Sequence, residues 1–369
     1  MVQFLLTGAR LKSTKLFGCA ALAVLLLAAP AWASKKSTEK AVEPPPPPEM
    51  QLLGGRKLAY ERSFHSAREV QPKRTFWKKV LDFVAGEPEF HTLVRPYSIV
   101  TDSRGRIIVT DPGAFGVHIF DFQQQKYKFL SRVDNRKDPM LTPQCVAVDA
   151  QDNIYVTDSQ SGKVFVFSSD GKYQRVIGSL KGGEGFFKRP TGIAVDSAAQ
   201  RIYVTDTLRD KIFVTDMRGS VVQTIGSNGE GTGEFNFPTE LRLHGDALVV
   251  VDAMNFRVQV LDRSGQFQYA IGQIGDQSGT MFRPKGVGFD SEGDLYVVDG
   301  LWGVVQAFDR EGELLYTFGE RGTGAGEFQL PTGLTIDHAD RIFVVDSFNR
   351  RVQVFHYYGL PKAAKGGSQ

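Results

Sequence analysis

Six histidines are the side chains of this 369-residue chain that most directly suggest metal binding or proton transfer. A metal or catalytic site needs several such groups to converge from fixed positions in the fold. The histidines follow no common spacing, and they stand at residues 65, 91, 118, 244, 338 and 356. We therefore predict no catalytic residue, no metal ligand and no cofactor from this set.

Glycine-rich segments are the next candidates, because they resemble loops that bind phosphate. They read GSLKGGEGFFKRP, GSNGEGTGEFNFP and GERGTGAGEFQLP. A phosphate loop leads into a helix whose first N–H groups face the anion. Here each segment leads into an apolar run typical of a strand, so we interpret the glycines as turn residues that adopt positive φ.

A set of cations recurs at one point of a repeated phrase. Arg95, Arg189 and Arg283 each stand directly before a proline, and Lys285 follows the third of these prolines. If the prolines mark equivalent places, the three guanidinium groups surround one end of the fold. There they suit a carboxylate, a phosphate or an acidic peptide. The alternative is that each arginine forms an ion pair with a neighbouring turn aspartate.

Apolar side chains also stand in segments that are expected to be loops, where they are unusual unless they pack inward or meet a partner. Trp302, in DGLWGVV, is the strongest contact candidate, and Phe348 is another. The alternative for Trp302 is packing between two repeats. The full set is Phe115, Leu208, Met254, Phe256, Leu301, Trp302 and Phe348.

An internal repeat positions these candidates. Each copy alternates apolar runs of about five residues with polar turns, as in CVAVD-AQDN-IYVTD-SQSG-KVFVF, which predicts four antiparallel strands. Successive copies are 46 to 48 residues apart. Their opening prolines are Pro96, Pro143, Pro190, Pro238, Pro284 and Pro331, and their second strands end at Asp111, Asp158, Asp206, Asp252, Asp299 and Asp346. We expect these aspartates to accept local backbone hydrogen bonds.

Six four-stranded units of this length predict an all-β fold, a six-bladed β-propeller, because stacking such units in a ring buries both faces of each sheet. The last copy lacks a fourth strand. We predict that KLAYERSF, residues 57–64, supplies it and closes the ring. We also predict a short amphipathic helix in residues 71–86, covering one end of the ring.

The repeats resemble the NHL family. DAMNFRVQVLDRSGQF, DSFNRRVQVF and the phrase F-x-x-P-T-G-x-x-x-D carry the resemblance, which covers residues 96–358. It implies a six-bladed propeller, a fold that hosts scaffolds, RNA-binding domains and enzymes. Related propeller lyases use converging histidines, and propeller lactonases use Glu, Asn and Asp on calcium. Glu240 is the one residue here that suggests such a ligand.

The N-terminus predicts export. Three basic residues, a short apolar run and Ala31-Trp32-Ala33 form a signal peptide, with an uncleaved anchor or a lipoprotein as alternatives. Without residues 1–33 the chain is formally neutral, so we expect no nucleic acid as partner. Cys145 is the one cysteine left, and we expect it to be buried. The predicted segments are 1–33 signal, 34–50 proline-rich linker, 51–95 closing strand and helix, 96–358 repeats and 359–369 tail.

These patterns favour an exported, periplasmic or extracellular, non-catalytic scaffold that binds a protein or peptide. The alternative is a metal-dependent propeller hydrolase or lyase.

Overall fold

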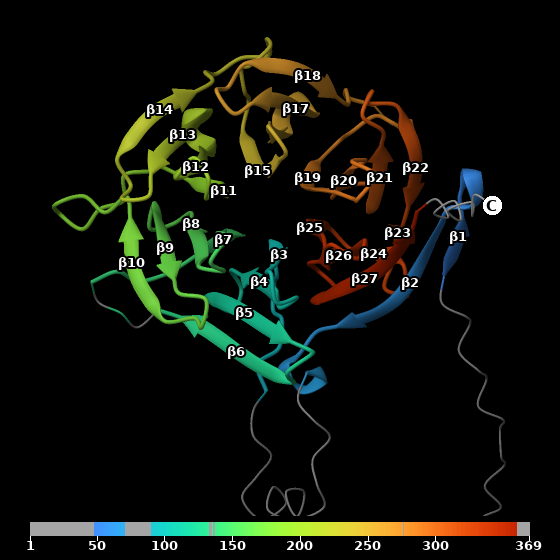
Figure 1. The fold of residues 1–369 in the computed structure, drawn as a ribbon, viewed down its shortest axis with the longest axis horizontal. Helices are drawn as coiled ribbons and strands as arrows, with labels where there is room; N and C mark the ends of the chain where they lie inside the picture. Colours follow the sequence, from blue (N-terminus) through green and yellow to red (C-terminus); the bar gives the residue numbers. More distant parts are fainter. Residues whose placement is uncertain (1–47, 71–89, 133–134, 136, 276, 360–369) are drawn as a thin grey trace, which may run out of the picture. The chain divides into compact units, whose positions relative to one another are not determined.

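The computed structural model describes residues 48–70, 90–132, 135, 137–275 and 277–359. In this part the chain forms six antiparallel sheets arranged as blades around a central axis (Figure 1). The predicted all-β six-bladed propeller is therefore confirmed. The signal peptide, nearly all of the proline-rich linker, the helix predicted in residues 71–86 and the tail from residue 360 lie outside the described residues.

Blades 1 to 5 each consist of four strands in sequence order from the centre outward. Blade 1 contains β3 (Ile99–Thr101), β4 (Ile107–Asp111), β5 (Gly116–Asp121) and β6 (Lys126–Ser131); blade 2 contains β7 (Pro143–Val148), β8 (Ile154–Asp158), β9 (Lys163–Phe167) and β10 (Tyr173–Ile177). Blade 3 contains β11 (Pro190–Asp196), β12 (Arg201–Asp206), β13 (Lys211–Asp216) and β14 (Val221–Ile225); blade 4 contains β15 (Pro238–His244), β16 (Ala247–Asp252), β17 (Arg257–Asp262) and β18 (Phe267–Ile271). Blade 5 contains β19 (Pro284–Phe289), β20 (Leu295–Asp299), β21 (Val304–Phe308) and β22 (Leu314–Phe318).

Blade 6 is completed by the N-terminal part of the chain, as predicted. It contains β25 (Pro331–Ile336), β26 (Arg341–Asp346), β27 (Arg351–Tyr358) and β2 (Lys57–Phe64). Strand β2 pairs antiparallel with β27 from Lys57 opposite Tyr358 to Phe64 opposite Val352. A fifth strand that the sequence did not indicate, β1 (Glu49–Gln51), pairs with β2, so residues 49–50 belong to the blade and not to the linker.

The remaining elements are short. A parallel pair, β23 (Glu320–Arg321) and β24 (Glu327–Phe328), lies in the connector between blades 5 and 6. The 3-10 turns are η1 (Leu53–Gly55), η2 (Ala67–Glu69), η3 (Thr207–Arg209) and η4 (Ala253–Asn255). In the described part of the chain, no helix has the length and apolarity needed to cross a membrane.

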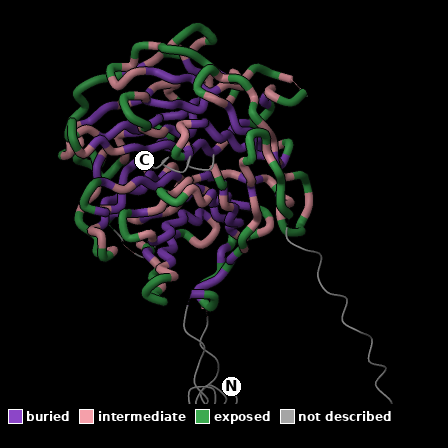
Figure 2. Tube along the Cα trace, turned by 45° about the vertical axis from the view of Figure 1, so that its right-hand side comes forward, coloured by how far each residue is buried: buried purple, intermediate pink, exposed green. Residues whose placement is uncertain are grey.

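The hydrophobic core is divided into six clusters, one at each junction between neighbouring blades. At the junction of blades 5 and 6, for example, Tyr296 and Val305 pack with Leu334 and Phe355. Exposed residues lie mainly in the loops and outer strands (Figure 2). Both faces of each sheet are thus covered, which explains why the inner strands are apolar on both sides.

The recurring aspartates are fully buried and structural, as predicted. Asp158 accepts hydrogen bonds from the backbone N–H groups of Leu141 and Thr142, both at 2.6 Å, and from that of Ser161 at 2.8 Å. Each aspartate therefore ties the start of the first strand to the end of the second. In blades 3, 4 and 6 the same carboxylate also pairs with an arginine of the following loop or strand: Arg209, Arg257 and Arg351.

The strand directions define two faces of the ring. The connectors between blades and the loops between second and third strands lie on one face, here called the connector face. The turns between first and second strands, and between third and fourth strands, lie on the opposite face. All six opening prolines and all six aspartates are at the connector face.

Candidate functional site

The residue after each opening proline lies at the mouth of the central channel. In blade 3, Thr191 donates its hydroxyl hydrogen to the carbonyl of Thr239, which holds the same position in blade 4, at 2.8 Å. Thr332 of blade 6 donates to the carbonyl of Tyr97 of blade 1 at 2.7 Å. Lys285 has this position in blade 5, so an ammonium group stands where the other blades place uncharged side chains.

Burial and neighbouring cations disfavour the charge on Lys285. Desolvation and the guanidinium groups of Arg283 and Arg189 together lower its pKa to about 8, against the opposing influence of Cys145 and Glu240. Both arginines also act on Tyr97 of blade 1, whose pKa desolvation raises. Arg189 and Arg283 are thus close enough to Lys285 to act on its pKa, whereas the predicted ring that also includes Arg95 stays a prediction.

The alternative ion pairs with the turn aspartates are not formed. Asp299 accepts hydrogen bonds from the backbone N–H groups of Arg283 at 3.2 and 3.3 Å and of Phe282 at 2.7 Å. Asp206 and Asp111 accept the backbone N–H groups of Arg189 and Arg95 in the same way. Among the described residues, no ion pair joins the guanidinium group of Arg95, Arg189 or Arg283 to a carboxylate, and Asp206 pairs with Arg209 instead.

Deeper in the channel lies an ion pair that the sequence did not reveal. Arg242, on β15, donates hydrogen bonds to the carbonyls of Ile99 at 3.0 Å, Val146 at 3.4 Å and Leu334 at 3.4 Å, on blades 1, 2 and 6. Its guanidinium therefore lies across the axis from its own blade. It also pairs with the buried carboxylate of Glu240 at 2.6 Å. Glu240 thus forms an ion pair with a residue of its own strand and is not an unpaired carboxylate.

Apolar side chains gather on the connector face. Of the large apolar residues that are exposed in the described chain, nine lie in its connectors and loops, whereas the opposite face exposes Leu53 in the turn between β1 and β2 and no other large apolar residue in its turns. They are Val94, Phe115, Leu180, Leu208, Met254, Ile274, Phe282, Trp302 and Phe348. Apolar surface concentrated in this way is typical of a binding face.

Trp302 is partly exposed and lies against a neighbour on one side. Its ring meets Phe282 edge-on, with 6.5 Å between the ring centroids, and Phe282 in turn packs on Phe256 at 5.9 Å. Both neighbours lie toward blade 4, so this packing is on the side away from blade 6, where the sequence alternative placed it. The side chain keeps 39% of its surface exposed, which leaves it available to a partner.

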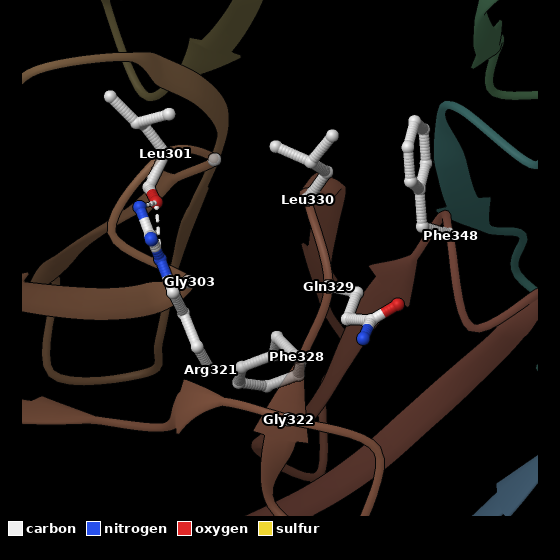
Figure 3. Close-up of a pocket in the computed structure, with 9 residues that line it drawn as sticks. Leu301, Gly303, Arg321, Gly322, Phe328, Gln329, Leu330 and Phe348 are labelled. Carbon is white, nitrogen blue, oxygen red and sulfur yellow. Dashed lines mark hydrogen bonds between the residues drawn. The ribbon is translucent and has the colours of Figure 1, made fainter.

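A cavity of about 420 Å³ opens between the loops of blades 5 and 6. Leu301, Leu330 and Phe348 extend in the same direction from its walls, and Phe328 lies at its base (Figure 3). Arg321 closes one side by donating hydrogen bonds to the carbonyl of Leu301. Sequence reasoning identified Leu301 and Phe348, but it did not single out Leu330, Arg321 or Phe328.

The residues best suited to chemistry have structural partners. His118 is buried, with its Nδ1 2.8 Å from the Tyr127 hydroxyl and its Nε2 3.5 Å from Asp111. Burial lowers the pKa of His118, and it raises that of the Cys145 thiol, which is buried as predicted. Within residues that the structure describes, no three His, Cys, Asp or Glu side chains are placed to hold a metal ion.

Comparison with known proteins supports the fold. A family model described as a 6-bladed beta-propeller matches residues 141–202, 194–244 and 289–363. A comparison with curated proteins gave no match.

Similar solved structures include proteins of different activities. A streptogramin B lyase is 15% identical with a TM-score of 0.52, over 71% of this chain and 93% of its own. Virginiamycin B lyase from Staphylococcus aureus, solved with quinupristin, is 15% identical with a TM-score of 0.52, over 73% and 86%. An auxiliary nutrient binding protein from Bacteroides thetaiotaomicron is 12% identical with a TM-score of 0.56, over 72% and 69%. At these identities the likeness shows the fold alone.

Proposed function

We propose that this six-bladed β-propeller is a non-catalytic binding module that holds a protein or peptide on its connector face. The observation that carries the proposal is the gathering of nine exposed large apolar side chains in the connectors and loops of that face. Removing such side chains from water is the main source of affinity in most interfaces, and aromatic residues are enriched there. The cations at the channel mouth add a preference for an acidic partner.

The main alternative is a metal-dependent hydrolase or lyase. Its support is the likeness of fold to lyases, a likeness that extends equally to a nutrient-binding protein. We favour binding because the blades differ most in exposed apolar and cationic residues, which suit recognition. Metal analysis of the purified protein separates the two functions: a stoichiometric calcium or zinc ion would favour the enzyme.

We also infer that the repeats are of the NHL type and that the chain is exported. The motifs containing Asn255 and Arg257, and Asn349 and Arg351, support the first inference. The basic and apolar pattern of residues 1–33 supports the second. Fractionation of cells and N-terminal sequencing of the mature protein test export and show whether the leader is removed.

Site-specific photo-crosslinking tests the binding face. A benzoylphenylalanine at position 302 or 348 is expected to give discrete adducts in cells, because both side chains are exposed on the connector face. The matched control places the same group at Tyr269, an exposed aromatic on the outer strand β18. Adducts of equal yield at all three positions, or at Tyr269 alone, would contradict the proposal.

A variant carrying Trp302→Ala and Arg283→Ala provides the second arm. It is expected to lose most adducts formed from position 348 while its melting temperature stays near that of the wild type, since both side chains are on the surface. The control is Arg218→Ala, an exposed arginine on the opposite face. Unchanged adducts in the double variant would remove these residues from the binding face.

A further inference from the structure

The cavity between blades 5 and 6 has a specific structural cause. The fourth residue after each recurring aspartate is left-handed in every blade, with φ between 50° and 71°. In blades 3 and 4 a side chain at this position meets the following connector: Asp210 accepts the backbone N–H of Phe237 at 2.8 Å, and Phe256 packs on Phe282. Blades 2 and 5 have glycine here. At Gly162 the following connector takes the space, since a Cβ would lie 2.3 Å from the carbonyl oxygen of Phe187, whereas at Gly303 the nearest atom would be 3.0 Å away and no side chain fills the corresponding space.

Gly303 therefore leaves an opening beside Phe328 and Arg321, and this opening belongs to the cavity. A Cβ built on Gly303 would lie 3.0 Å from Cγ of Arg321 and 3.4 Å from the carbonyl oxygen of Phe328. The Arg321 side chain can shift by a few tenths of an ångström. A larger residue could thus occupy this position and fill the cavity, as Phe256 fills the space in blade 4.

The cavity adjoins the cations of the channel mouth. Gly300 lines the cavity, and a Cβ at this glycine would lie 3.2 Å from Cγ of Lys285 and 3.6 Å from the carbonyl oxygen of Arg283. Neither cation has a carboxylate partner among the residues that the structure describes. The apolar cavity is thus adjacent to two cationic residues of the connector face that form no ion pair.

We propose that the cavity and these cations form a single site for an acidic peptide segment that carries one bulky apolar residue. The inference rests on the proposed function and specifies the partner's chemistry. The apolar side chain enters beside Gly303, in a cavity whose size lies within the range of ordinary ligand sites. Asp or Glu residues of the same segment reach Lys285 and Arg283.

Charge complementarity selects a peptide over a small apolar carboxylate as the occupant. Positive charge continues from Lys285 to Arg189, which lies on blade 3, two blades from Arg283. A single carboxylate would engage only the cations beside the cavity. An extended segment can engage both parts, because its residues advance by about 3.3 Å each.

Peptide display on the purified full-length protein tests the site without assuming a partner. The enriched sequences are expected to contain one Phe, Trp, Leu or Met flanked by Asp or Glu. One enriched peptide, synthesised with a fluorescent label, is then measured by anisotropy. Its affinity is expected to fall at least tenfold when its apolar residue is changed to Ala, and at least tenfold when its acidic residues are changed to Asn or Gln.

Variants of the protein locate the binding. Gly303→Phe fills the cavity and is expected to weaken the labelled peptide at least tenfold, and Arg283→Glu is expected to do the same. The matched controls are Tyr269→Ala and Arg218→Glu, which change an exposed aromatic residue and an exposed arginine away from the site. Circular dichroism melts check that each variant is folded, and Phe348→Ala, a wall residue that is 60% exposed, replaces Gly303→Phe if the latter does not fold.

Three results would overturn the inference. These are enrichment of peptides without acidic residues, unchanged binding to Gly303→Phe and Phe348→Ala, and failure to enrich any peptide above the Arg283→Glu protein. A fourth arm uses phenylpropionate: binding as tight as that of the peptide would show that a small apolar carboxylate is the occupant instead. Photo-adducts at residues 302 and 348 that persist despite these results would leave the proposed binding face standing and remove only the peptide site.

Discussion

The two faces of the ring use the same backbone for different purposes. On the opposite face, aspartates satisfy their own turns: Asp309 accepts the backbone N–H groups of Glu311 at 3.0 Å and Glu313 at 2.8 Å, and Asp262 binds Ser264 and Gln266 similarly. These turns expose no large apolar side chain among the described residues. On the connector face, aspartates also satisfy the backbone, but the loops between them expose aromatic and aliphatic side chains.

The comparison shows that the framework and the binding surface are separable. The six aspartates maintain each blade through backbone contacts, so the loop residues around them are free to vary. Asp299, for example, accepts the backbone N–H of Trp302, a bond that does not depend on which side chain stands there. The blade-to-blade differences on one face therefore indicate function more directly than the repeated residues do.

The largest effect is expected from opening the ring, because the two faces exist only while it is closed. Deleting residues 48–64 removes β1 and β2 and exposes the edge of β27. We expect aggregation, or a melting temperature lowered by on the order of 10 °C or more. Calorimetry and light scattering measure both effects. Val222→Ser, on the exposed outer strand β14, is the control, and a deletion that melts like this control would contradict closure by β2.

The next largest loss of stability is expected from breaking the ion pair between Arg242 and Glu240 in the channel. Arg242→Met leaves the Glu240 carboxylate buried without its partner, which we expect to cost about 2–4 kcal/mol of unfolding free energy. Desolvation already raises the pKa of Glu240, and this loss raises it further. The folded state then binds the extra proton, so the variant should gain stability as pH falls from 7 toward 5.

Denaturant unfolding at several pH values measures this effect. The double variant Glu240→Gln, Arg242→Met removes both charges and should recover most of the lost stability. If Arg242→Met is as stable as the wild type at pH 7, the guanidinium group does not stabilise the contacts at the axis.

Much of this architecture was predictable, because a repeat reports the same geometry six times. The missing fourth strand of the last copy indicated β2 with the bounds that the structure shows, and the phrase before each proline indicated the shared face of Arg95, Arg189 and Arg283. The strand pattern could not show that the side chain of Arg242 crosses the axis. Alternation of apolar and polar residues indicates the side of the sheet on which a residue lies, but not which distant backbone groups its side chain reaches. Strand β1 was missed because three residues beside a proline run carry no periodic signal.

The cavity was hidden for a related reason. Gly303 looked like an ordinary turn glycine, and its importance depends on what Phe256 does at the same position of blade 4. A comparison of the copies at each left-handed position would have indicated it. The role of Arg321 could not be predicted. Its partner is the backbone carbonyl of Leu301, and every residue has such a carbonyl, so the sequence does not indicate the contact.

A smaller effect is expected at the channel mouth. The folded-state pKa of Lys285 is about 8, below the ordinary 10.5, because of burial and of Arg283 and Arg189, against the opposing influence of Cys145 and Glu240. Below pH 8 the folded protein must hold a disfavoured charge, and stability should rise as pH rises from about 8 to 10.5. Lys285→Met removes this cost and should stabilise the protein at pH 7 by on the order of 1–2 kcal/mol.

The same substitution should weaken an acidic peptide while it stabilises the fold, which distinguishes a functional cation from a structural one. Peptide affinity should fall as pH rises from 7 to 9 in the wild type and lose most of this dependence in Lys285→Met. Anisotropy titrations across this range provide the measurement. A Lys285→Met variant that is less stable than the wild type and binds equally well would show that the ammonium serves packing alone.

The smallest effect is expected at His118, which tests whether the one buried histidine of blade 1 belongs to the framework. Its position, seven residues after the aspartate, is Gln259 in blade 4 and Gln353 in blade 6, and both glutamines donate to their aspartates at 3.0 and 3.1 Å. His118→Gln should therefore change the unfolding free energy at pH 7 by less than about 1 kcal/mol. Because burial lowers the pKa of His118 below the unfolded value near 6.5, the wild type loses stability as pH falls below that value, and the variant should lose less. Unfolding curves at pH 7.5 and 5.5 measure the difference, and a variant with the same acid sensitivity as the wild type would place the titrating group elsewhere.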